Sequence, residues 1–195
     1  MLIICGLFFP LLCEFGERHY LKTQTINIET VQTSKNISAN LQDVWNQIHF
    51  YEDSNSYSSW LTLAGFPRPI GTSGFIKEVG AKTKCIYEGG FIDKTITAVD
   101  IDKKTARFEF DVINQVNVED HAIKLIDGGF YLTQQDTQKT SLTLKTTYKP
   151  LMTPRFIWRP FEKATNQALH MHIIKEIEHQ IKQPSRIKMR LSTNQ

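Results

Sequence analysis

Apolar and polar side chains alternate along much of the middle of the chain, with a period of two residues. In the clearest segment, residues 106–112, Ala106, Phe108, Phe110 and Val112 share one face and charged side chains stand between them. A strand with one apolar face belongs in an antiparallel sheet that has one face against a core and the other in solvent. This pattern constrains the fold most, because the shared apolar face needs an element to cover it.

The same alternation predicts strands in five further segments: Phe75–Val79, Thr83–Tyr87, Phe91–Val99, Ile123–Thr133 (through Gly128-Gly129) and Leu142–Tyr148. An earlier strand is predicted over Leu21–Val31, where two isoleucines stand two residues apart. Turn-forming residues separate successive strands at Gly89-Gly90, Asp102–Lys104 and Asp136–Lys139. Short turns of this kind predict a meander.

Helices are predicted at both ends of this strand-rich region. A Ser/Asn-rich break at residues 34–40 ends at Asn40, which can cap a short helix. A second short helix is predicted over Ser58–Leu63. The last element begins near Pro160, a residue suited to the first turn of a helix, and nothing breaks it before Gln183. The fold class predicted is α+β: a curved antiparallel sheet of about seven strands wrapped around a long C-terminal helix, with two short helices after strand 1.

The buried stripe of the long helix changes character along its length. Its C-terminal half presents Ile173, Ile177 and Ile181, which must pack on the sheet. The same stripe, followed toward the N-terminus, meets His170, Asn166 and Glu162. A buried polar group without a partner costs about 1–3 kcal/mol. Either the first half of the helix is exposed, or it lines a cavity that holds water or a ligand.

Large aromatic side chains favour the cavity. The strands and the start of the helix supply more rings than one interface between a sheet and a helix packs tightly, which favours a partly open pocket. Each ring taken alone is an ordinary core residue. The candidate ligand-binding residues are Trp60, Phe91, Phe110, Phe130, Tyr148, Trp158, Glu162, Asn166 and His170.

Several kinds of chemistry lack support in the sequence. His170 and His172 are two residues apart on a helix, so their side chains diverge and cannot share a metal, and we expect no metal and no cofactor. The GTSG at residues 71–74 lacks the lysine of a phosphate-binding loop. Cys85 lies in a predicted strand and is interpreted as a buried, inert thiol. Lys and Arg number 23 against 20 Asp and Glu, a balance that argues against a nucleic-acid partner.

The two ends of the chain differ from its centre. Residues 1–13 carry no charged side chain, but a bilayer span needs about 20 apolar residues. Three interpretations stay open for this segment: a membrane-surface anchor, a remnant of a longer membrane region, or a strap packed on the domain. Residues 184–195 form a basic tail with no acidic residue. Both ends could contact an anionic membrane surface, so we expect a membrane-associated or cytoplasmic protein.

Three segments resemble a known superfamily. They are WLTLAGFPRPI (60–70), GTSGFIKEVGAKTKCIYEGGFIDKTITAVD (71–100) and IWRPFEKATNQALHMHIIKEI (157–177). They are similar to the START-like, polyketide cyclase-like (SRPBCC) superfamily, in a branch whose domain often follows a membrane region. The resemblance covers about residues 14–183 and implies a helix-grip fold with a deep apolar cavity. It also implies a lipid, sterol or polyketide ligand or, in some members, cyclase or dehydratase activity. Asp93 stands where relatives often have a glutamate.

The first functional hypothesis is that the domain, residues 14–183, binds a hydrophobic small molecule oriented by Glu162, Asn166 or His170. The alternative is an enzyme of cyclase or dehydratase type in which a cavity histidine or carboxylate acts as general base. The second alternative is a membrane-tethered interaction module. We expect a monomer, and we favour binding over catalysis.

Overall fold

The computed structural model describes residues 27–48, 67–74, 76–118 and 120–182. The apolar segment 1–13, the predicted helix Ser58–Leu63 with Trp60, and the basic tail 184–195 lie outside the described residues. The predictions made for those three segments therefore stay predictions.

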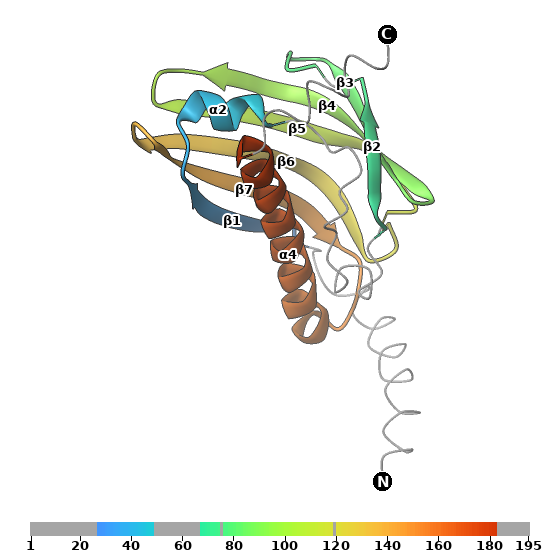
Figure 1. Ribbon diagram of the computed structural model, residues 1–195. Coiled ribbons are helices and arrows are strands. Elements are labelled where there is room, and N and C mark those ends of the chain that lie inside the picture. Colours follow the sequence, from blue (N-terminus) through green and yellow to red (C-terminus); the bar gives the residue numbers. More distant parts are fainter. Residues whose placement is uncertain (1–26, 49–66, 75, 119, 183–195) are drawn as a thin grey trace.

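One antiparallel sheet forms the body of the domain, as the alternation predicts. Its seven strands stand in the order β1-β7-β6-β5-β4-β3-β2, so each pairs with its neighbour in the chain except β1, which pairs with β7. The sheet curves around the long helix, which runs across its inner face (Figure 1). The strands are β1 (Glu29–Ile37), β2 (Pro69–Ser73), β3 (Lys82–Tyr87), β4 (Gly90–Ile101), β5 (Thr105–Val116), β6 (Ile123–Asp136) and β7 (Lys139–Pro150).

Two helices of the described part of the chain cover the inner face of the sheet. The short helix α2 (Leu41–Asn46) is capped as predicted, because the Asn40 side chain accepts a hydrogen bond of 2.8 Å from the Asp43 backbone nitrogen. The long helix α4 (Arg155–Lys182) packs with α2 and the sheet. Their common core holds Val44, Phe108, Leu132, Leu142 and Ile174 among other buried side chains. The α+β, helix-grip architecture is confirmed.

The helix α4 begins five residues before the predicted start at Pro160 and has 28 residues. The reason lies at its first turn, where the Pro154 carbonyl accepts hydrogen bonds from the backbone nitrogens of Ile157 and Trp158. Pro160 is therefore inside the helix, where it lacks the backbone N–H that would donate to the Phe156 carbonyl. In the part of the chain that the structure describes, no helix combines the length and apolar character needed to cross a membrane.

Two predictions about the strands are wrong. The Ser/Asn-rich segment was predicted to be a break, but its first residues belong to β1, which ends at Ile37. Its alternate polar side chains face outward and pair across the sheet, as Ser34 does with Thr143 at 2.7 Å. Residues 76–79 do not form a strand; the strand in this region is β2, and bends and a turn follow it. That turn is fixed by Gly80, whose φ is 86° and whose nitrogen donates to the Ile96 carbonyl.

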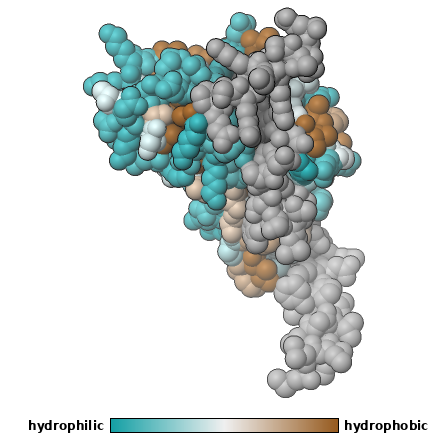
Figure 2. Space-filling view, in the orientation of Figure 1, coloured by the Kyte–Doolittle hydropathy of each residue, from teal (hydrophilic) through white to brown (hydrophobic). Residues whose placement is uncertain are grey.

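Among the described residues on the face shown in Figure 2, hydrophilic side chains dominate and apolar ones gather in several separate places. The most exposed large apolar residues come from distant parts of the described chain: Ile28, Val79, Ile113 and Phe156. Scattered exposed apolar residues are normal for globular proteins.

Gly90, the first residue of β4, gives a test of the register between β4 and β5. Gly90 has an ordinary φ, but a Cβ atom there would come within 2.3 Å of the Val116 carbonyl oxygen on the neighbouring strand. We expect Gly90→Ala to lower the free energy of unfolding by about 1–3 kcal/mol, because backbone rather than a side chain has to move. Gly71→Ala, where a Cβ meets nothing within 4 Å, is the matched control. Urea denaturation measures both, and equal stability of the two variants would contradict the register.

Candidate functional site

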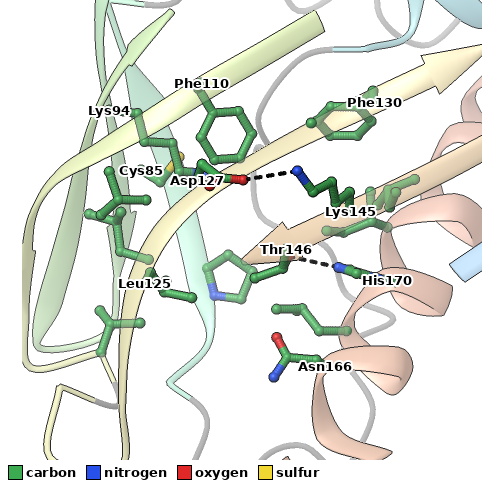
Figure 3. Close-up of a pocket in the computed structure, with 18 of the residues that line it drawn as sticks. Cys85, Lys94, Phe110, Leu125, Asp127, Phe130, Lys145, Thr146, Asn166 and His170 are labelled. Carbon is green, nitrogen blue, oxygen red and sulfur yellow. Dashed lines mark hydrogen bonds and ion pairs between the residues drawn. The ribbon is translucent and has the colours of Figure 1, made fainter. Parts of the chain in front are cut away.

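A cavity lies between the inner face of the sheet and α4. Strands β2 to β7 contribute to its lining, and α4 closes it with a row of residues that includes Asn166, His170 and Ile173. Figure 3 shows Asn166 and His170 opposite side chains of the strands, with the cavity between them. The volume is about 110 Å³. A cavity forms here as the aromatic content predicts.

Most of the wall on the sheet side is apolar. Phe110 and Val112 contribute from β5, Ile123 and Leu125 from β6, and Leu144 from β7. The cavity also explains a change along β5, where Ala106 and Phe108 are buried but Phe110 and Val112, on the same face, are only half-buried. The inner face of the strand stops being packed where the cavity begins. An apolar ligand would complete that packing.

The polar stripe of α4 is buried. Glu162, Asn166 and His170 are 5%, 3% and 2% exposed. The alternative in which the first half of the helix is exposed is therefore wrong. Asn166 and His170 line the cavity, whereas Glu162 does not. The Asn166 amide also donates a hydrogen bond of 2.9 Å to the Glu162 carbonyl one turn earlier.

His170 is held by two hydroxyl groups. Its Nε2 is 2.8 Å from Thr146 Oγ1 on β7, and its Nδ1 is 3.0 Å from Thr33 Oγ1 on β1. The first of these contacts is drawn in Figure 3. Burial lowers the pKa of His170 to about 4, so the imidazole is neutral near pH 7 and one nitrogen donates while the other accepts. His170 thus joins α4 to both strands beneath it.

Glu162 serves an ion-pair network at the start of α4 instead of the cavity. Arg155 binds both of its carboxylate oxygens, at 2.7 and 2.6 Å, and also reaches Glu29 on β1 at 2.9 Å. Arg159 binds the other oxygen of Glu29 at 3.1 Å. A bidentate arginine and carboxylate pair is among the strongest polar contacts in proteins. With Trp158, Glu162 lines a smaller adjacent pocket that shares Asn166 with the main cavity.

Two predicted aromatic residues lie away from the cavity. Tyr148 is fully buried in a separate cluster with Val31 and Ile123, and burial and the nearby Glu162 raise its pKa. Phe91 belongs to the outer face of β4, where the Lys84 ammonium lies 4.1 Å from the centre of its ring. Alternation along the strand explains this placement, because the buried Ile92 next to Phe91 faces the opposite side.

Of the nine predicted residues, the structure brings four to the main cavity: Phe110, Phe130, Asn166 and His170. Trp158 and Glu162 line the adjacent pocket, and Tyr148 and Phe91 line neither. Trp60 lies outside the described residues. Asp93 shares the outer face with Phe91 and pairs with Lys84 at 3.5 Å.

Lys94 is the most buried of the charged residues that line the cavity, and it is not among the nine predicted residues. It is 8% exposed, lines the cavity, and places its ammonium 4.1 Å from the centre of the Phe110 ring. Burial lowers its pKa, and the neighbouring Cys85 thiol acts in the opposite direction. The alternation along β4 indicates that Lys94 faces the interior, because it stands in phase with the apolar Ile92 and Ile96.

Among the residues that the structure describes, no group of three or more His, Cys, Asp or Glu side chains could hold a metal ion. Cys85 is buried and lines the cavity. Asp127 and Lys145 also belong to the lining and form an ion pair with each other at 3.5 Å. The cavity therefore offers apolar surface, hydrogen-bonding side chains from α4 and β7, and one buried amine from β4.

The environment of His170 predicts a pH dependence of stability. The unfolded chain binds a proton near pH 6.5, whereas folded His170 binds one only near pH 4. Because protonation of His170 favours the unfolded chain, the free energy of unfolding is unaffected by this group above pH 6.5. It falls by about 3 kcal/mol as the pH drops toward 4. Denaturant unfolding across this range should show a larger loss in the wild type than in His170→Gln, which keeps the contribution of His172, whose pKa is also lowered by burial. His121→Gln, at a side chain that is 86% exposed, should follow the wild type; equal curves for all three proteins would contradict the assignment.

Comparison with known proteins rests on structure alone. No protein-family model matches the chain, and no curated protein matches its sequence. A START superfamily protein from Mycobacterium smegmatis matches with a TM-score of 0.55 and 13% identity, over 80% of this chain and 99% of that one. The Zhui aromatase/cyclase from Streptomyces sp. R1128 matches with a TM-score of 0.53 and 11% identity, over 82% and 99%. The chain therefore has the START-like, polyketide cyclase-like fold.

Proposed function

We propose that this protein binds a hydrophobic small molecule in the cavity between the sheet and α4. The observation that carries the proposal is the half-packed inner face of β5, where Phe110 and Val112 continue the row of Ala106 and Phe108 but face open space. Burying apolar surface contributes about 25 cal/mol per Å². A ligand that fills this space buries the apolar surface of walls that are already formed, and this burial stabilises the complex.

The size of the cavity limits the ligand. A water molecule needs about 10–15 Å³ of such volume, so the 110 Å³ of the cavity corresponds to about seven to eleven waters. A short acyl chain or a compact molecule of a few aromatic rings, reaching into the open side of the cavity, suits this space better than a sterol does. Asn166 and His170 lie on one side of it and would orient a polar group of the ligand.

Acid–base catalysis has less support in the same geometry. Both nitrogens of His170 are engaged by hydroxyl groups, and a pKa of about 4 makes it a weak base near pH 7. Glu162 is bound by Arg155, and Asp93 lies on the outer face with Lys84. These contacts favour binding over the cyclase or dehydratase alternative. The membrane-tethered alternative depends on residues 1–13, which lie outside the described chain, and it stays a prediction.

Filling the cavity tests the proposal. Val112 lines the cavity, whereas the next residue, Ile113, is 66% exposed on the other face of β5. We expect Val112→Trp to weaken the binding of the neutral fluorescent probe N-phenyl-1-naphthylamine by about tenfold or more, because the indole occupies its space. Ile113→Trp, the matched control, should bind the probe like the wild type. Thermal unfolding of each variant verifies that it is folded.

Two results would contradict the proposal. One is a wild-type protein that neither binds the probe nor releases an apolar compound on solvent extraction and mass spectrometry. The other is equal probe affinity in Val112→Trp and Ile113→Trp, which would place any binding outside the cavity.

A further inference from the structure

Asn166 presents a hydrogen-bond acceptor to the cavity. Its side chain is 3% exposed and lines both the main cavity and the adjacent pocket. The amide nitrogen donates to the Glu162 carbonyl, and because a carbonyl can only accept, this contact fixes which atom of the amide is the oxygen. Among the residues that the structure describes, none donates a hydrogen bond to that oxygen. The atom is accessible rather than enclosed by protein atoms.

The polar side chains beside Asn166 on α4 and β7 are already paired with other groups. His170, one turn later, is engaged at its two nitrogens by Thr33 and Thr146. Figure 3 shows the Asn166 oxygen on the side of Thr146 and His170, and the amide nitrogen directed away from them. The oxygen therefore depends on the contents of the cavity for a hydrogen-bond donor.

The chemistry of an amide oxygen limits what can bind there. A buried acceptor without a donor costs free energy, which a hydroxyl or N–H group of a ligand removes. A carboxylate or an ether oxygen does not remove it, because each of these groups can only accept. A neutral ligand with a hydrogen-bond donor at one end is the chemistry that matches this part of the wall.

We propose that the ligand is a neutral alcohol or phenol whose hydroxyl group donates a hydrogen bond to Asn166 Oδ1. This inference rests on the proposed binding function and adds the chemical class of the ligand. The hydroxyl group lies where the main cavity meets the adjacent pocket, because Asn166 and Ile123 line both. The apolar part of the ligand fills the main cavity against Leu125 and Leu144.

Gln167 supplies a matched control for Asn166. Asn166→Leu removes the amide, and the Glu162 carbonyl keeps its helix hydrogen bond from the backbone nitrogen of residue 166, so the variant is expected to fold. Asn166→Ala removes the amide as well but leaves a smaller side chain. Gln167→Leu makes the same exchange of an amide for leucine at the next residue, which is half-buried and lines neither the main cavity nor the adjacent pocket.

The test compares octan-1-ol with heptyl methyl ether, two isomers of which only the alcohol has a hydrogen-bond donor. Displacement of N-phenyl-1-naphthylamine gives their affinities, with the affinity of each protein for the probe measured separately. We expect the ratio of alcohol to ether affinity to fall by about fivefold or more in both Asn166→Leu and Asn166→Ala. Gln167→Leu should keep the wild-type ratio. Because the two Asn166 variants differ in size, their agreement separates loss of the acceptor from a change in cavity volume.

Each other outcome overturns the proposal in a recognisable way. If the probe binds but the ratio is the same in all four proteins, the cavity binds ligands without a hydrogen bond to Asn166. If only one of the two Asn166 variants lowers the ratio, a change in volume explains the effect. If Gln167→Leu lowers the ratio equally, the effect does not come from the cavity wall. If the wild type does not bind the probe at all, the proposed function fails and the acceptor site fails with it.

Discussion

The contact between α4 and the sheet changes from apolar to polar along the helix, and the cavity depends on that change. At one end Ile174 and Ile177, 0% and 2% exposed, pack into the main core with Phe108 and Leu142. At the other end the buried side chains of the helix are polar and meet hydroxyl and charged partners. Close apolar packing pulls the helix onto the sheet only where the isoleucines are. Elsewhere the helix is held by directed contacts, and space remains beneath it.

Those directed contacts form two supports. His170 bridges the hydroxyl groups of Thr33 and Thr146, and Arg155 joins Glu162 to Glu29. Both link α4 to β1, the edge strand next to β7. Loss of one partner in a buried ion pair costs about 3–5 kcal/mol, because the other charge is left uncompensated. The polar stripe therefore has a structural role at Glu162 and a place in the cavity wall at Asn166 and His170.

The periodicity of the sequence predicts most of this fold, because an alternating strand and an amphipathic helix each have one way to bury their apolar face. It fails where tertiary contacts replace the local pattern: at Ser34, whose hydroxyl pairs with a neighbouring strand, and at residues 76–79, where Gly80 turns the chain. For the site, choosing aromatic residues by size led to Phe91 and Tyr148, which lie elsewhere. The alternation of apolar residues along β4 would have identified Lys94, because Ile92 and Ile96 face the same side of the strand.

The central claim is that an apolar ligand occupies the space between the sheet and α4. Methyl chemical shifts measured by nuclear magnetic resonance during titration with N-phenyl-1-naphthylamine test it most directly. Binding of the probe in the cavity predicts shifts at the methyl groups of Val112, Leu125 and Leu144, and none at the exposed Val79 and Ile113. Shifts confined to the exposed methyl groups, with those of the cavity unchanged, would contradict it.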